Sequence, residues 1–278
     1  MIRIGILSGN ASNAESIKLV QQFKDFKITG IAQDIDAQST KSQQYTAEEL
    51  VFNSDATYIN IQSPSFELVQ MVIRKSNHLF LNTIPNFDLD QTKQLINLAN
   101  EAGTNILLFN PLIFLNKKFQ IQKYQNKLKL IHIRLALDST DFESQLLNLL
   151  LFMTAIEKSE VRKSDVFAFE GVKKSSLINL RIQFSSGTVA QIELGEMFTT
   201  KQSVIEIFQK DERPASFPIA HLDPKTILTA ERNALTHFIK SIVKQTTISI
   251  SLNELEQALI CLGEIKEKLK YFNYTRLN

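Results

Sequence analysis

The sequence predicts an α/β protein in two parts, a doubly wound parallel sheet followed by an α+β domain with an open, mainly antiparallel sheet. Over about the first 110 residues, short β-branched apolar runs alternate with longer segments of helical period, which is the βαβ pattern. From about residue 120, apolar strands follow one another with turns between them. At 278 residues the chain is long enough for two hydrophobic cores.

The first part alternates strands with helices in order. Strands are predicted at 3–7, 28–33, 56–61, 78–82 and 105–110, and helices at 14–23, 39–45, 65–76 and 89–102. Ser65 and Asp88 stand where N-caps belong, and Gly103 ends the last helix as a C-cap. Because parallel strands need long crossovers, we expect helices on both faces of this sheet.

The second part begins with a predicted strand over 128–137 and a strongly apolar helix over 143–158. Further strands are predicted at 165–172, 176–184, 188–198 and 203–210, then a long loop over 211–224 and helices at 230–245 and 252–271. The loop of Ser185, Ser186 and Gly187 predicts a hairpin. The predicted domains are therefore 1–117 and 118–278, and it stays open whether the last helices pack on the first domain.

The composition excludes several function classes. With 31 Lys and Arg against 29 Asp and Glu, the chain gives no electrostatic reason to expect nucleic acid or an anionic membrane as a partner. The single cysteine, Cys261, cannot form an internal disulfide, and the four histidines lack ligand spacing, so no metal site is predicted. No apolar run reaches the roughly 20 residues of a membrane span, and the chain opens on a strand, which favours a cytoplasmic protein.

The segment DATYINIQSPSFELVQMVIRKSNHLFLNTIPNFDLDQTKQLINLANEAG has the rhythm of strand, helix, strand and helix ending in EAG. Together with the two-part organisation, it resembles the Gfo/Idh/MocA family, named for glucose-fructose oxidoreductase and inositol dehydrogenase. The resemblance covers nearly the whole chain. It implies a Rossmann dinucleotide-binding domain, NAD or NADP as the cofactor, and oxidation or reduction of a sugar, cyclitol or similar small substrate.

The phosphate-binding turn implied by the resemblance is poor in glycine. Aligning SGNASN from Gly5 places Ser8, Asn10 and Asn13 at the three fingerprint positions, whereas a shift of one residue places Gly9, Ala11 and Ala14 there. In the second alignment one extra methyl group stands where phosphate should pass. The N-terminus of the following helix can still attract an anion.

Other cofactor positions have also changed. Asp34 ends the second strand, where the family places its ribose-binding carboxylate, but a helix cap or a solvated loop explains it equally well. Ile61 and Gln62 replace the threonine and proline that lie along the nicotinamide in the family. If a cofactor is bound, the resemblance assigns its binding to Ser8, Gly9, Asn10, Asn13, Asp34, Ile61 and Gln62.

The positions of the family's catalytic residues hold no proton-transfer groups. The family's EKP triplet aligns with Thr83, Ile84 and Pro85, so isoleucine replaces its lysine and Thr83 is the possible polar substitute. In the apolar helix of the second part, Gln145 aligns with the family's histidine and Asn148 with its aspartate. Neither an aliphatic chain nor an amide exchanges protons near neutral pH.

These changes favour a noncatalytic binding or assembly homologue, because four features of one mechanism have changed together. The alternative is an atypical NAD(P)-dependent oxidoreductase in which Thr83, Gln145 and Asn148 orient the substrate. A nucleotide- or sugar-binding sensor is a third possibility. The strands at 176–184 and 188–198 alternate apolar with polar residues, and the resemblance implies that this open face forms a homodimer.

Overall fold

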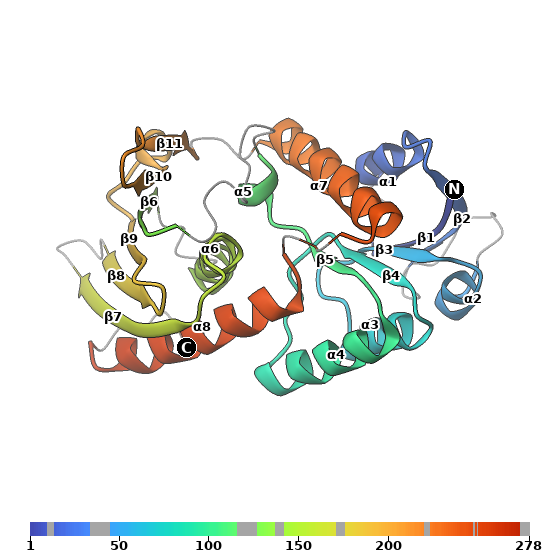
Figure 1. Ribbon diagram of the computed structural model, residues 1–278, viewed down its shortest axis with the longest axis horizontal. Coiled ribbons are helices and arrows are strands. Elements are labelled where there is room, and N and C mark those ends of the chain that lie inside the picture. Colours follow the sequence, from blue (N-terminus) through green and yellow to red (C-terminus); the bar gives the residue numbers. More distant parts are fainter. Residues whose placement is uncertain are drawn as a thin grey trace. The chain divides into compact units, whose positions relative to one another are not determined.

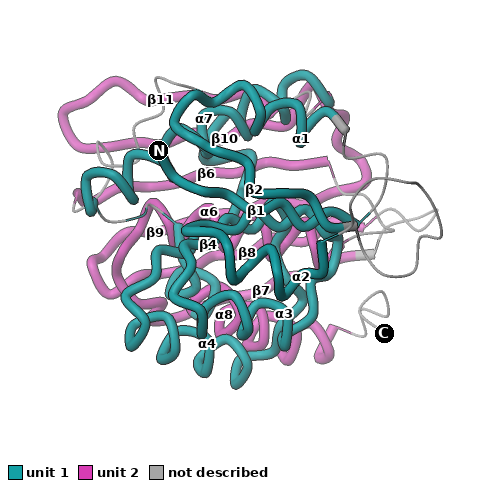
Figure 2. The backbone as a smooth tube through the Cα atoms, turned by 90° about the vertical axis from the view of Figure 1, so that its right-hand side faces the viewer, with its two compact units in different colours: residues 1–119, 224–256 teal, residues 120–223, 257–278 magenta. Residues whose placement is uncertain are grey.

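The structure is a computed structural model that describes residues 1–9, 14–33, 45–115, 127–136, 142–170, 176–219, 223–246, 248 and 250–272. The chain divides into two compact units, coloured teal and magenta in Figure 2. Unit 1 contains residues 1–119 and 224–256, and unit 2 contains residues 120–223 and 257–278. A late segment of the chain therefore belongs to the same unit as its beginning.

Unit 1 is built on a five-stranded sheet in the order β2-β1-β3-β4-β5, in which every neighbouring pair is parallel. The strands are β1 (Ile2–Ser8), β2 (Phe26–Gln33), β3 (Ala56–Asn60), β4 (His78–Leu81) and β5 (Ile106–Leu108). All residues of β3 and β5 are buried, as expected for a sheet covered on both faces. The predicted doubly wound parallel sheet is confirmed.

Helices cover both faces of this sheet. They are α1 (Ala14–Gln21), α2 (Ala47–Phe52), α3 (Phe66–Arg74), α4 (Leu89–Ala102), α5 (Pro111–Phe114) and α7 (Pro224–Lys244). In Figure 1, α1 and α7 lie on one face, and α3 and α4 lie together on the other. The predicted caps are present: Ser65 and Asp88 accept from the third backbone N–H of their helices, and Gly103 ends α4 with φ 63°.

The second helix was expected over 39–45, and residues 34–44 lie outside the described part of the chain. A helix, α2, runs over Ala47–Phe52. Thr46 and Glu49 explain where α2 begins, because they form a capping box with hydrogen bonds of 3.1 and 2.9 Å. The sequence TAEE carries this signal.

Unit 2 contains a six-stranded sheet in the order β11-β10-β6-β9-β8-β7. The strands are β6 (Lys129–Ala136), β7 (Val161–Glu170), β8 (Ser176–Phe184), β9 (Val189–Gly195), β10 (Val204–Gln209) and β11 (Ala215–Pro218), and the 3-10 helix η4 (Thr200–Gln202) precedes β10. The β6–β9 pair is parallel and the other pairs are antiparallel, which confirms the predicted sheet. Gly187, with φ 90°, closes the predicted hairpin between β8 and β9.

One face of the unit 2 sheet is buried and the other is open. Alternate residues of β8 are buried, among them Ile178, Leu180 and Ile182, and α6 (Phe142–Ile156) is almost wholly buried. The part of α8 (Leu252–Lys270) that belongs to unit 2 lies against β7, because Ser164 donates to Glu264 at 2.9 Å. The opposite face, which includes Arg181, carries the polar half of the alternation.

Two boundaries in the later sequence differ from those predicted. The segment 211–224 was expected to be a loop, but it contains the edge strand β11, and α7 begins at Pro224 instead of 230. Both differences involve proline. An edge strand tolerates proline because one side needs no ladder partner, and proline is favoured in the first turn of a helix.

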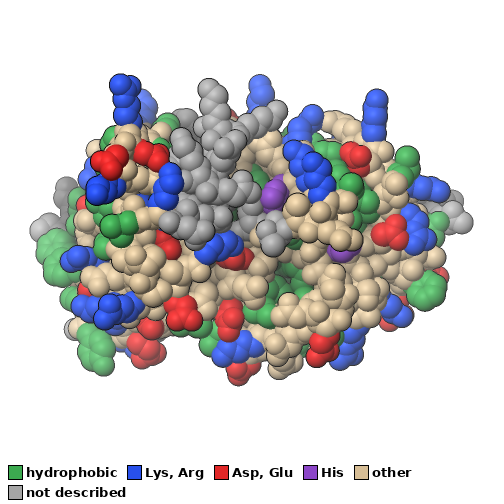
Figure 3. Space-filling model, viewed as in Figure 1, with side chains coloured by type: hydrophobic (Ala, Val, Ile, Leu, Met, Phe, Trp, Pro, Cys, Tyr) green, Lys and Arg blue, Asp and Glu red, His purple; other side chains and the backbone are tan. Residues whose placement is uncertain are grey.

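Basic and acidic side chains are interspersed over the face seen in Figure 3. Among the described helices, none is long and apolar enough to cross a membrane.

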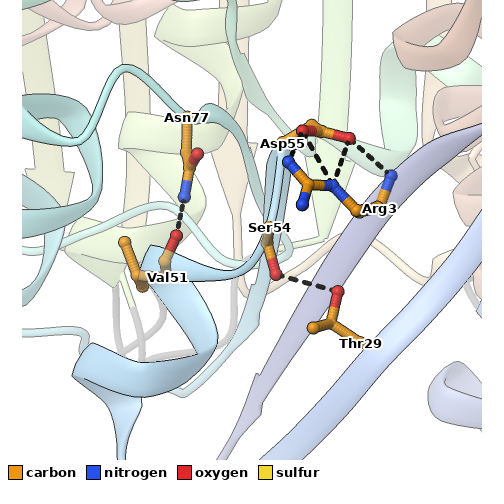
Figure 4. A network of polar contacts seen from close by, with 6 residues as sticks. All are labelled: Arg3, Thr29, Val51, Ser54, Asp55 and Asn77. Carbon is orange, nitrogen blue, oxygen red and sulfur yellow. Dashed lines mark hydrogen bonds and ion pairs between the residues drawn. The ribbon is translucent and has the colours of Figure 1, made fainter.

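Polar contacts at the amino edge of the unit 1 sheet tie its strands together (Figure 4). The Arg3 guanidinium approaches the Asp55 carboxylate to 2.6 Å, and the hydrogen bond from Arg3 lowers the pKa of that carboxyl. Ser54 donates to Thr29 at 3.1 Å, and the Asn77 amide donates to the Val51 carbonyl at 2.6 Å. These six residues therefore satisfy one another's polar groups.

A buried carboxyl joins α7 to α1 and β3 inside unit 1. Glu231 of α7 is 2% exposed, and it accepts hydrogen bonds from the Tyr58 hydroxyl and, at 3.0 Å, from the Ser16 hydroxyl. Burial raises the pKa of Glu231 despite these two bonds, and burial also raises the pKa of Tyr58. Folding therefore makes the Glu231 carboxyl easier to protonate than it is in the unfolded chain.

In unit 2, an ion pair joins the start of β6 to the residue that follows α6. The Lys129 ammonium lies 2.6 Å from the Glu157 carboxylate, and the two side chains are 0% and 4% exposed. A second pair, Lys127 with Glu212 at 2.7 Å, is 48% and 35% exposed. The two pairs differ chiefly in burial, which makes the exposed pair a matched control.

Replacing one member of the buried pair should be costly. Lys129→Met leaves the Glu157 carboxylate buried without its cation, and we expect a loss of about 3 to 5 kcal/mol in the free energy of unfolding. Adding Glu157→Leu should recover most of that loss. The control Lys127→Met should cost less than about 1 kcal/mol. Urea denaturation measures all three, and equal effects at the two pairs would contradict this assignment.

The Glu231 carboxyl should make stability depend on pH with a defined sign. Because its folded pKa lies above its unfolded pKa, the stability it contributes is present at low pH and is lost as the pH rises through the folded pKa. Glu231→Gln keeps an acceptor for Tyr58 and a donor for Ser16 but does not titrate. In denaturant unfolding between about pH 5 and pH 8, the free energy of unfolding of the variant should increase relative to that of the wild type as the pH rises.

A control variant replaces an exposed glutamate. Glu67 is exposed on α3, so the free energy of unfolding of Glu67→Gln should have the same pH dependence as that of the wild type. If the difference between Glu231→Gln and the wild type does not change with pH, Glu231 is ionised in the folded protein.

Candidate functional site

The carboxyl ends of the five parallel strands meet at one edge of the unit 1 sheet, where open α/β sheets bind their ligands. The strand register pairs Ser8 directly with Asn60, and Ile59 with Leu81, so Asn82 follows β4 beside the end of β3. This edge therefore brings together the residues that follow β1, β3 and β4. Among the predicted site residues, these are Ser8, Gly9, Ile61, Gln62, Thr83 and Ile84.

Backbone contacts hold the first predicted residues in place. Ser8 is buried at the end of β1, and the Gly9 N–H donates to the Asn60 carbonyl at 3.1 Å. A Cβ atom on Gly9 would lie 3.7 Å from Ile61 Cα, which is ordinary contact. The packing of unit 1 therefore does not require glycine here, and the bare backbone leaves room beside β3.

The residues after β4 include the possible polar substitute. The Thr83 hydroxyl donates to the Ile61 carbonyl at 2.7 Å, so its proton is used within the protein. Ile84 and Ile61 are partly exposed, and Gln62 is exposed. Thr83 can accept a hydrogen bond from a ligand but has no free proton to give.

Two asparagines that the sequence analysis did not single out form the polar centre of this edge. The Asn82 amide nitrogen donates to Asn60 Oδ1 at 3.2 Å. Asn82 Oδ1 is itself buried and has no hydrogen-bond donor in the described part of the protein. Asn110, after β5, differs because its Oδ1 caps α5 by accepting from Leu112 N at 3.0 Å. In the sequence, the only sign of Asn60 and Asn82 as site residues is that each is a polar residue at the end of an apolar strand.

Several predicted residues lie elsewhere. Asn10, Asn13 and Asp34 lie outside the described residues. Gln145 and Asn148 lie three residues apart on α6 in unit 2, both partly exposed, and the Asn148 amide donates to the Ser144 carbonyl at 2.8 Å. The spacing puts the two amides on one face of α6.

Titratable groups are missing from the described carboxyl edge. In residues 8–9, 60–66, 82–87 and 109–115 there is no Asp, Glu, His, Cys, Tyr, Lys or Arg. The described ranges also contain no group of three His, Cys, Asp or Glu side chains placed to hold a metal ion. The edge offers amides, hydroxyls and backbone groups only.

These groups fit the neutral part of a dinucleotide. Asn82 Oδ1 provides a buried acceptor for a ribose hydroxyl or a carboxamide N–H, and Gly9 presents backbone without a side chain. A pyrophosphate would depend on backbone N–H groups at the start of α1, because the edge residues just named include no cation.

Solved structures with the same architecture are dehydrogenases and a reductase. UDP-N-acetylglucosamine 3-dehydrogenase from Acidithiobacillus ferrooxidans has a TM-score of 0.72 at 14% identity, with 98% of each chain covered. Apo scyllo-inositol dehydrogenase from Lactobacillus casei has 0.70 at 11%, with 96% of each chain covered. A biliverdin reductase from Synechocystis, in complex with biliverdin and NADP+, has 0.64 at 12%, covering 96% of this chain and 98% of that one.

No protein-family model matches the chain, and no curated protein sequence matches it. At identities this low, the likeness to solved structures shows the fold and leaves the chemistry to be argued from the site. By its parallel sheet, its mixed sheet and its coverage of these neighbours, this chain has the two-domain fold of the Gfo/Idh/MocA dehydrogenases.

Proposed function

We propose that this protein is a noncatalytic homologue of the oxidoreductases that share its fold, and that it serves as a binding or assembly partner. One observation carries the proposal: the described residues that follow the unit 1 strands, 8–9, 60–66, 82–87 and 109–115, include no side chain that titrates near neutral pH. Moving a proton to or from a substrate hydroxyl requires such a group within hydrogen-bond reach.

The remaining polar groups do not replace it. The Thr83 proton is already donated to a carbonyl, and the amides of Gln145 and Asn148 do not titrate. The isoleucine at position 84 can neither donate a hydrogen bond nor carry charge. Binding without turnover is therefore the behaviour that these residues support.

The buried oxygen of Asn82 supports one noncatalytic role in particular, that of a sensor that binds a nucleotide or a sugar. An unsatisfied buried acceptor costs free energy, and a ligand hydroxyl or N–H would satisfy it. The ligand class that fits is a small, neutral, hydroxyl-rich or amide-bearing molecule, with NAD or NADP among the candidates.

The competing function is an atypical NAD(P)-dependent oxidoreductase acting on a sugar, cyclitol or similar substrate. The dehydrogenases with the same fold support it. The nicotinamide would then supply the hydride, while Thr83, Gln145 and Asn148 would orient the substrate. Such an enzyme would need a proton acceptor other than the described residues of the carboxyl edge.

Assembly through the open face of the unit 2 sheet is the second part of the proposal. On that face Leu130, Phe167 and Phe169 are 41%, 56% and 53% exposed. Exposed apolar side chains grouped on one face are typical of interaction surfaces. A homodimer that pairs this face with itself would bury them.

Calorimetric titration with NAD, NADH, NADP and NADPH tests the proposal. We expect at most weak binding of these nucleotides, with dissociation constants above about 100 μM, since the turn after β1 is poor in glycine and the described residues that follow the strands include no cation. Binding tighter than this, coupled to reduction or oxidation of an added polyol or ketone, would overturn it. Tight binding of one of these nucleotides without turnover would favour a sensor function.

Asn82 should behave as a ligand-binding residue and not as a structural one. We expect Asn82→Leu to leave the free energy of unfolding within about 1 kcal/mol of the wild type, since removing the unsatisfied buried oxygen offsets the loss of the 3.2 Å hydrogen bond to Asn60. The matched control is Asn110→Leu, which removes the α5 cap and should cost about 1 kcal/mol or more. A larger loss at Asn82 than at Asn110 would contradict this role.

A further inference from the structure

A buried carboxyl group lies on the same face of the unit 1 sheet as the polar centre of the carboxyl edge. Tyr58 and Asn60 are two residues apart in β3, so their side chains leave one face of the sheet. Asn60 Oδ1 accepts from Asn82 at the edge, and the Tyr58 hydroxyl donates to Glu231 of α7. Glu231 therefore bonds to the side-chain row next to the one that carries the polar centre.

The same carboxyl group reaches the first turn of α1. Its Oε2 accepts from the Ser16 hydroxyl at 3.0 Å, and Ser16 is the third residue of α1. Figure 1 shows α1 and α7 side by side on this face of the sheet. The backbone N–H groups of a first helical turn have no partner within the helix and form the positive end of its dipole. Glu231 thus places an acidic group at the helix end on which a pyrophosphate would depend.

The surroundings of Glu231 on α7 are apolar. Its side chain is shielded from water, since the residue is 2% exposed. The residues one turn before and after it on α7 are Ile227, Leu228, Ala234 and Leu235. Burial raises the pKa of Glu231, and the hydrogen bonds from Tyr58 and Ser16 oppose that shift. Because water is excluded, a negative charge on this carboxyl group acts on its neighbours with little screening.

Charged groups on the elements packed against α7 do not neutralise this carboxyl group. Glu15 and Lys18 of α1 are exposed, and so is Arg232 of α7. His237 packs against α5, and His78, at the amino end of β4, accepts from a backbone N–H. Within the described part of unit 1, the groups that shift its pKa are the two hydroxyl donors and burial, with no cation among them.

We propose that Glu231 is a specificity-determining residue that excludes phosphate-bearing ligands from the carboxyl edge, so that the edge takes a neutral ligand. This rests on the binding function proposed above and narrows its ligand class. A phosphate at the start of α1 brings a second negative charge close to the buried carboxylate, and like charges repel strongly where water is excluded. A nucleoside or a sugar without phosphate brings no such charge.

Calorimetric titration of the full chain with ADP and with adenosine tests this role, because the two probes differ only in the phosphates. At pH 8 we expect the wild type to bind ADP no more tightly than adenosine. Glu231→Gln removes the charge but keeps an acceptor for Tyr58 and a donor for Ser16. The variant should bind ADP at least about tenfold more tightly than the wild type does, with its affinity for adenosine unchanged.

A comparison at two pH values separates the charge of Glu231 from its packing. A nearby anion raises the pKa of this carboxyl group further, so the wild type takes up a proton when ADP binds, and that uptake is easier at low pH. The ratio of the ADP dissociation constants of the wild type and Glu231→Gln should therefore be smaller at pH 6 than at pH 8. Titration of ADP itself and of the two histidines occurs with both proteins and cancels in this ratio.

Ser16→Ala is the matched control. It removes a hydrogen bond to Glu231 and keeps the carboxylate, so it should bind ADP as weakly as the wild type does. If Ser16→Ala tightens ADP binding as much as Glu231→Gln does, the effect comes from altered packing of α1, and the role of Glu231 is contradicted.

The remaining outcomes separate this role from the proposed function. Equal ADP affinity in the wild type and Glu231→Gln, undetectable binding by both included, would overturn the role of Glu231 and leave the noncatalytic function standing. The same ratio at pH 6 and pH 8 would also overturn it. Oxidation of NADH by the wild type in the presence of a ketone would instead overturn the noncatalytic function.

Discussion

Parallel hydrogen bonding between β1, β3 and β4 is the constraint on which the rest of unit 1 depends. It brings the carboxyl ends of the strands to one edge and sets Ser8 beside Asn60, and Asn82 follows β4 on the other side of Asn60. At the amino edge, Arg3 and Asp55 satisfy each other. At the carboxyl edge, the Asn82 oxygen stays unsatisfied. Open parallel sheets bind their ligands at this carboxyl edge.

Most of the fold could be predicted because its signals are local. Ser65, Asp88 and Gly103 mark helix ends by chemistry that needs no tertiary contact, and period-two alternation identifies the strands of unit 2. The edge strand β11 was missed because its prolines imitate a loop. The place of α7 depends on the bond between Glu231 and Tyr58, which lie 173 residues apart.

The candidate site could be predicted only in part. The residues aligned with the family's active site led us to expect lost chemistry, and the structure adds that the Thr83 proton is donated to the Ile61 carbonyl. Asn82 could not be identified from the sequence, because its unsatisfied oxygen depends on the register between β3 and β4. Local patterns carry no information about register between distant strands.

We propose that the fold of a dehydrogenase persists here without its chemistry. This can be tested by the absorbance of reduced nicotinamide when NADH or NADPH is mixed with the protein and a panel of keto sugars, inosose and biliverdin. A dehydrogenase of the same fold serves as positive control. We expect no oxidation above the rate in buffer. A rate that scales with protein concentration and falls in a Thr83→Val or Gln145→Leu variant would contradict it.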